Sequence, residues 1–302
     1  MHLPVELVQE IVIALTTPEY ALQFGHTKDV LHALCQLCLA DRTFFLISVP
    51  HLYSSIVVLT QRELELLLQT SPTLRSRSRA LWLRYIPNTD TLVAELLFDM
   101  SQGLRRLALD IPGNVLDSSA AIRLALEHCA YLEDFTRTGY SPMQLFRPHP
   151  FWPDWNALRR LVLDGPLIDD AFIRTVSELP YLAHLAVIEP RWRYSADGTE
   201  VATFLCLLKA SPSLVRLVLI YCEASQFYLS SLKRLRVGLT VDGLRQGPSI
   251  SYLVIRGRVP GPMSQVRDQI GYGMIWDLDS KKLSGPQVLW PPTPKCLANN
   301  RS

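Results

Sequence analysis

The 302-residue sequence predicts an α/β protein, in which an N-terminal helical module is followed by an irregular solenoid of strand–helix repeats. Two observations predict this fold. The pattern Leu-x-x-Leu-x-Leu, with Val or Ile at some positions, recurs between residues 104 and 255, and helical stretches separate several of its copies. Short apolar segments at helical spacing fill the first 54 residues. We therefore expect a helical module over 1–54, a repeat array over 55–259 and a C-terminal cap with a partly disordered tail over 260–302.

Composition narrows the functional class. The chain is 48% hydrophobic and 19% charged, which argues against global disorder. A net charge of +2 gives no overall attraction to nucleic acid or to anionic membranes. No apolar run reaches the roughly 18–20 residues of a membrane span, and the first residues lack the pattern of a secretory signal. The sequence thus predicts an intracellular protein, cytoplasmic or nuclear.

The N-terminal segment predicts two helices and a third apolar stretch. Pro4 suits a first helical turn, and Leu7, Val8, Ile11 and Leu15 form one apolar stripe that ends before Pro18. Asp29 is the expected N-cap of a second helix over 30–40. The third apolar stretch covers 44–49, residues 50–53 are expected to form a turn, and a strand is expected over 55–59.

The order of these segments resembles an F-box, the module with which substrate receptors dock onto the Skp adaptor of cullin ubiquitin ligases. The resemblance rests on Leu3-Pro4-Val5-Glu6-Leu7 at the start and Pro50-His51-Leu52-Tyr53 at the end. The first two helices are about ten residues further apart than usual, as in large fungal families of F-box-like proteins. The resemblance implies a helix-in-groove contact with the adaptor. The implied adaptor-binding residues are Leu3, Pro4, Leu7, Ile11 and Leu15 in the first helix, and Leu34, Leu37 and Leu39 in the second. Alternatively, the helices only cap the open end of a repeat core.

The rest of the chain resembles a leucine-rich repeat array. The middle anchors of the pattern are residues 81, 107, 135, 161, 185, 217, 235 and 253, with steps of 26, 28, 26, 24, 32, 18 and 18. Most early steps fall within the 20–29 residues typical of such repeats. Helices are expected over 117–131, 169–179 and 199–210. Where the family carries Asn or Cys after its last leucine, this chain has Pro112, Pro166, Pro190 and Cys222. Because proline has no backbone N–H to hydrogen-bond at the turn of each repeat, an uneven array is expected.

One surface has predicted functional content. In a Leu-x-Leu strand the residues beside the leucines point to the opposite, solvent-facing side. These positions carry Trp82, Arg84, Arg106, Arg160, Arg216, Arg234, Arg236, Tyr252 and Arg256. Such an arginine strip is either ordinary solvated surface or a recognition surface for an acidic or phosphorylated protein, because arginine binds carboxylate and phosphate bidentately. Asp110, Asp134 and Asp164 lie on the same side and dilute its charge.

Catalytic and metal motifs are missing from the sequence. There is no phosphate loop, zinc-protease motif or nucleophile elbow, so no catalytic residue, cofactor or metal is predicted. Cys35-x-x-Cys38 lacks a second pair, and its spacing with Leu31 and Leu34 favours a buried helix face over a metal site. We therefore expect a non-catalytic substrate-recognition subunit of a Skp–cullin–F-box ligase, which binds a protein target through its repeats. The alternative is a leucine-rich scaffold with no ligase role.

Overall fold

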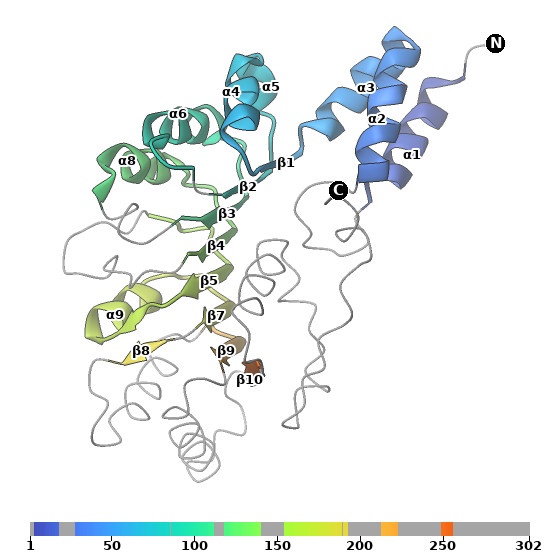
Figure 1. The fold of residues 1–302 in the computed structure, drawn as a ribbon. Helices are drawn as coiled ribbons and strands as arrows, with labels where there is room; N and C mark the ends of the chain where they lie inside the picture. The colour runs from blue at the N-terminus through green and yellow to red at the C-terminus, as the bar shows by residue number, and fades with distance from the viewer. Residues whose placement is uncertain are drawn as a thin grey trace, which may run out of the picture.

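The protein is an α/β molecule in which three N-terminal helices precede an open parallel sheet (Figure 1). A computed structural model describes residues 3–17, 28–84, 86–111, 118–139, 154–188, 190–192, 213–222 and 249–255. The helices are α1 (Val5–Thr16), α2 (Lys28–Ala40), α3 (Arg42–Leu52), α4 (Gln61–Gln69), α5 (Pro72–Arg75), α6 (Asp90–Met100), α8 (Ala120–His128) and α9 (Asp170–Ser177). The strands are β1 (Ser55–Val58), β2 (Ala80–Arg84), β3 (Arg106–Asp110), β4 (Asp134–Thr138), β5 (Arg160–Asp164), β6 (Leu167–Ile168), β7 (His184–Ile188), β8 (Arg191–Trp192), β9 (Arg216–Cys222) and β10 (Ser249–Ile255).

Helices α1, α2 and α3 pack on one another around Val8, Val12, Leu34 and Val49. Helix α1 ends at Thr16 as predicted. Two boundaries differ from the sequence predictions. Helix α2 already includes Lys28, so Asp29 lies in its first turn, where a carboxylate also favours the helix dipole. Helix α3 continues through Pro50, which was expected to begin a turn; a proline this close to the C-terminus removes only one helical hydrogen bond.

The large sheet is parallel throughout, and its strands follow the chain in the order β1-β2-β3-β4-β5-β7-β9-β10. Helices α4, α6, α8 and α9 lie on the same side of this sheet (Figure 1). One face of the strands forms the core with them. Its buried side chains are Leu81, Leu83, Leu107, Leu109, Phe135, Leu161, Leu163, Leu185, Val187 and Leu217. The predicted anchors from 81 to 217 thus share one register across six strands.

The register of the last strand corrects one predicted anchor. Leu217 pairs with Ile250, whereas Leu253 pairs with Ile220. In earlier copies the first leucine, such as Leu214, precedes its strand by two residues, but Ile250 lies inside β10. The spacing of the pattern alone could not reveal this shift. The other predicted anchor in this part of the chain, at residue 235, lies outside the described residues.

The start of each strand repeats one hydrogen-bond arrangement. The carbonyl of Glu133, just before β4, accepts the N–H groups of both Arg159 and Arg160, at 2.7 and 3.0 Å. The same double acceptance occurs six times in the described segments, at the carbonyls of Ser54, Arg79, Arg105, Glu133, Arg159 and Ala183, always between 2.7 and 3.0 Å. Each unit therefore meets the next through the same backbone geometry, although the units differ in length.

The prolines expected to disturb the array lie between paired strands. Pro166 precedes β6 and Pro190 precedes β8, and these two short strands form a second parallel sheet. Gly165, with a φ of 64°, makes the turn after β5, and its N–H donates to the Ile188 carbonyl. Proline at these sites is tolerated because the backbone pairing continues beyond it. Pro112 lies outside the described residues.

Side-chain caps begin several helices. Ser119 and Asp169 accept the backbone N–H groups of Ile122 and Phe172 and so cap α8 and α9. Helix α4 begins with a capping box formed by Thr60 and Glu63. The helix predicted over 199–210 and the C-terminal cap and tail expected over 260–302 lie outside the described residues.

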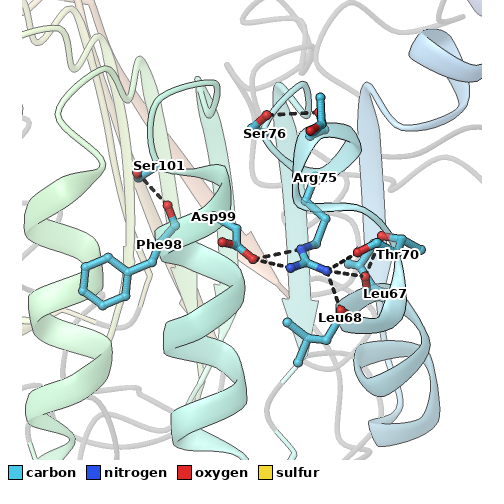
Figure 2. A network of polar contacts seen from close by, with 9 residues as sticks. Leu67, Leu68, Thr70, Arg75, Ser76, Phe98, Asp99 and Ser101 are labelled. Atoms are coloured by element: carbon cyan, nitrogen blue, oxygen red, sulfur yellow. Dashed lines mark hydrogen bonds and ion pairs between the residues drawn. The ribbon is translucent and has the colours of Figure 1, made fainter.

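Arg75 joins three helices in a buried polar network (Figure 2). Its Nη1 donates to the carbonyls of Leu67 and Thr70 at 3.2 and 2.6 Å, and to the Leu68 carbonyl, all at the end of α4. Its Nε donates to Asp99 of α6 at 2.9 Å. The guanidinium thus caps α4 and neutralises a carboxylate of the neighbouring unit. In the described part of the chain, no helix is long and apolar enough to cross a membrane.

Candidate interaction surfaces

The N-terminal helices expose an extensive set of apolar side chains. These residues are Leu3, Val5, Leu7, Ile11 and Ile13 around α1, Leu31 and Leu39 on α2, and Phe45 and Leu46 on α3. Leu7 and Ile11 are spaced four residues apart, so they lie along one flank of α1, and Leu3 lies two residues before this helix begins. Exposed apolar groups in such numbers are typical of a surface that binds another protein.

The structure divides the predicted adaptor-binding residues into two groups. Leu3, Pro4, Leu7, Ile11 and Leu39 are exposed, whereas Leu15 and Leu37 are half-buried. Leu34 is fully buried between the helices and cannot contact a partner. It belongs to the core that fixes the position of α2.

The paired cysteines of α2 do not share a buried face. Cys35 is exposed and Cys38 is half-buried, so the predicted packing role is wrong for Cys35. Burial and the neighbouring Cys35 raise the pKa of Cys38 above its usual value. Leu31, Cys35 and Leu39 instead line an exposed stripe of α2.

The predicted arginine strip contains an internal ion-pair ladder. Its first row consists of the residues that begin β3, β4, β5, β7 and β9, which are Arg106, Asp134, Arg160, His184 and Arg216. Asp134 is only 6% exposed and accepts from Arg106 Nε at 3.1 Å and from Arg160 Nη2 at 2.8 Å. Two of the predicted target-binding arginines therefore share one buried carboxylate.

His184 follows this ladder on β7, between Arg160 of β5 and Arg216 of β9. Burial, and then the charges of Arg160 and Arg216, hold the pKa of His184 below its usual value, while Asp134 opposes them. The imidazole is therefore neutral near pH 7. The cationic character of this part of the sheet comes from its arginines.

Trp82, in the middle of β2 on this sheet face, was predicted to be exposed to solvent, but the structure buries it. Trp82 is 2% exposed and forms an apolar cluster with Ala80 and Ala108. The small alanines flank it in sequence and across the register, and Val57 packs against the cluster. Trp82 is therefore a core residue in this structure rather than an exposed aromatic.

At the other end of β2, Arg84 remains partly exposed. Its Nε lies 3.6 Å from Asp110 Oδ2, and its guanidinium lies 5.9 Å from the centre of the Trp82 ring. Of the remaining strip, Arg234, Arg236 and Arg256 lie outside the described residues. Only the backbone of Tyr252 is described, in β10.

Arg137 is a buried arginine that the repeat pattern did not lead us to predict. Arg137 occupies a core-facing position between Leu109 of β3 and Leu163 of β5, and it is fully buried. Its Nε donates to the Ile111 carbonyl at 3.4 Å, and its Nη1 to the Asp164 carbonyl at 3.5 Å. The signal was present in the sequence, since the third leucine of the repeat is replaced by arginine in this copy only.

No protein-family model matches the chain, and no curated protein matches its sequence.

Proposed function

We propose that this protein is a non-catalytic substrate-recognition subunit of a Skp–cullin–F-box ubiquitin ligase. The exposure of Leu7 and Ile11 along one flank of α1 is the observation that carries this proposal. The F-box resemblance assigns these positions to adaptor contact. A module that served only as a cap would be expected to bury its apolar residues against the repeat core instead.

The interior of the helical module also supports a docking role. Val8, Val12 and Leu34 are at most 1% exposed, so the three helices have a packed core of their own. Such a core keeps the exposed leucines in a fixed arrangement, which reduces the entropy lost on binding. Bound in this way, the module would hold a target near a ubiquitin-charged enzyme and contribute proximity rather than chemistry.

The sheet suits the role of target holder. Parallel strands in chain order bring residues that are 24–32 positions apart into neighbouring places, as in leucine-rich repeats. We propose that these units form an irregular leucine-rich array with an intracellular role.

A second candidate function is a leucine-rich scaffold whose helices act as a cap. The connection between the two parts favours it, because only Tyr53 and Ser54 separate α3 from β1. Tyr53 packs against the repeat core, and the Ser54 carbonyl is the first of the six carbonyls that each accept two N–H groups.

Binding to the purified Skp adaptor tests the ligase role. We expect wild-type protein to bind at micromolar concentration or tighter, and Leu7→Asp/Ile11→Asp to bind about 100-fold more weakly. Each lost aliphatic anchor accounts for about 1.5–3 kcal/mol, and 1.4 kcal/mol is about tenfold. Calorimetric titration measures the difference.

The matched control is Gln9→Asp/Gln69→Asp, which adds the same charge at exposed polar sites on α1 and α4, outside the exposed apolar set. It should bind like wild type. Failure of the wild-type chain to bind the adaptor, with its circular dichroism intact, would remove the ligase role and leave the scaffold.

A further inference from the structure

A second row of side chains lies at the amino ends of the strands, outside the sheet face predicted to bind a target. It consists of the residues immediately before β2, β3, β4, β5, β7 and β9, which we call the amino edge: Arg79, Arg105, Glu133, Arg159, Ala183 and Val215. Backbone hydrogen bonds link each of these residues to the next, since the carbonyl of one accepts the N–H of the following one, and they therefore lie in one line across the sheet.

The arginines of the amino edge are less neutralised than those of the sheet face. Arg79 and Arg159 are exposed, and their side chains make no ion pair or hydrogen bond within the described segments. Arg105 stacks on an aromatic ring, with its guanidinium 5.0 Å from the centre of Tyr131. By contrast, Arg106 and Arg160 already share Asp134.

Exposed aromatic and apolar groups accompany these charges. Tyr131 is 50% exposed and Tyr181 64% exposed, and each lies three residues before its strand. Val215, at the β9 end of the edge, is 60% exposed. Tyrosine and arginine are the residue types that dominate binding energy at protein interfaces, whereas lysine and glutamate are depleted there.

The composition changes along the edge in one direction. Arg79 and Arg105 make the β2–β3 end cationic, and Glu133 and Arg159 follow. Ala183 and Val215 make the β7–β9 end apolar, beside Tyr181. Neighbouring strands lie about 4.8 Å apart, so the five steps from Arg79 to Val215 span about 24 Å, the length of about seven extended residues. A uniform polyanion such as nucleic acid would meet Glu133 and the apolar end, which favours a protein partner.

We infer that the amino edge, rather than the face of the sheet, holds the target, and that it binds an extended protein segment with acidic residues at one end and apolar or aromatic residues at the other. This inference rests on the proposed function, because it names the chemistry of the target that such a receptor would bind. The phosphate of a modified side chain and a plain carboxylate both fit the arginines.

Selection of peptides on the full-length chain tests the inference. A displayed library of random 12-residue peptides would be selected on wild-type protein, and single enriched peptides measured by fluorescence anisotropy. We expect enriched peptides to carry acidic residues beside aromatic or aliphatic ones, and to bind Arg79→Glu/Arg159→Glu at least about tenfold more weakly. Binding should also weaken as salt rises toward about 1 M, where the screening length is about 3 Å.

Arg62→Glu/Arg174→Glu is the matched control, since it makes the same change of charge at exposed helix positions. It should bind the peptides like wild type. Enriched peptides without acidic residues, equal loss in both variants, or equally tight binding of a single-stranded oligonucleotide would overturn the inference. The assay contains no adaptor, so its result is independent of the adaptor titration.

Discussion

Asp134 sets the charge of the sheet face through its position in the register. Its carboxylate is buried and lies between Arg106 and Arg160, so removing it would leave these two arginines, on the strands that flank β4, without their shared acceptor. The next strand in this row carries His184, which is held neutral beside Arg160 and Arg216. This row of three arginines, one carboxylate and one neutral histidine is positively charged, and its charge rises when His184 takes up a proton.

The titration of His184 gives a prediction about stability. Because its pKa in the folded protein is below the ordinary 6.5, the unfolded chain takes up a proton first as pH falls. The free energy of unfolding should therefore fall as pH drops below about 6.5, and His184→Gln should lose less stability over the same interval. Urea denaturation of both proteins at about pH 7.5 and 5.5 measures the difference. Parallel loss in the two proteins would show that His184 does not contribute.

At the scale of elements, Arg75 adds polar contacts to the direct packing between helices of neighbouring units. Helix α4 ends with several carbonyls that lack helical partners, and the guanidinium satisfies three of them while also pairing with Asp99. The Arg75 side chain is 4% exposed and the Asp99 side chain is 27% exposed, so the guanidinium is shielded from solvent while the carboxylate remains partly accessible.

Substitution of Arg75 should destabilise the protein strongly. In Arg75→Met the apolar stem is kept, but buried carbonyls and the Asp99 carboxylate lose their donors, which should cost about 3–5 kcal/mol. Arg77→Met, at an exposed site two residues on, should change stability by no more than about 0.5 kcal/mol. Urea unfolding monitored by circular dichroism compares the two. Similar midpoints would contradict a stabilising role for the network.

The elements also show what a single sequence can predict. The core-facing leucines of the strands were predictable because alternate residues of a strand face the same side, a pattern that is visible within a few residues of sequence. Helices α4 and α6 went unrecognised, although the capping box at Thr60 and the apolar spacing from Leu92 to Met100 were both present. The pairing of Asp134 with two arginines was not predictable, since it depends on register between residues 26 and 28 positions apart. Burial of Trp82 likewise depends on neighbouring strands. The apolar stripe of α1 alone did not show which of its residues are exposed: Leu7 and Ile11 are, whereas Val8 is buried.

At the scale of the whole molecule, the helical module and the sheet are two packed parts joined by Tyr53 and Ser54. The three helices bury their own core, and the sheet buries a separate one with α4, α6, α8 and α9. In Figure 1 the module lies beyond the β1 end of the sheet. This arrangement suggests that the sheet keeps its fold without the module.

Deletion of residues 1–52 tests this independence. The truncation keeps Tyr53, which packs on the core, and Ser54, whose carbonyl pairs with Arg79 and Ala80. We expect the remaining chain to be monomeric and to melt cooperatively in differential scanning calorimetry, within about 5 °C of the full-length protein. Aggregation or a broad, non-cooperative transition would instead favour the cap and the scaffold function.

The carbonyl before each strand accepts two backbone N–H groups of the next unit. This arrangement has a consequence for how the chain could change its length. Residues 106 and 134 hold equivalent places 28 positions apart, so excision of 106–133 would connect Arg105 directly to Asp134. The Arg79 carbonyl would then meet the N–H groups of Arg105 and Asp134, and the Arg105 carbonyl those of Arg159 and Arg160. Every backbone bond at the junction would be remade with the same geometry. Sheets of this kind can lose or gain a whole module by recombination between equivalent positions, whereas excision between positions that are not equivalent shifts the register of every strand that follows.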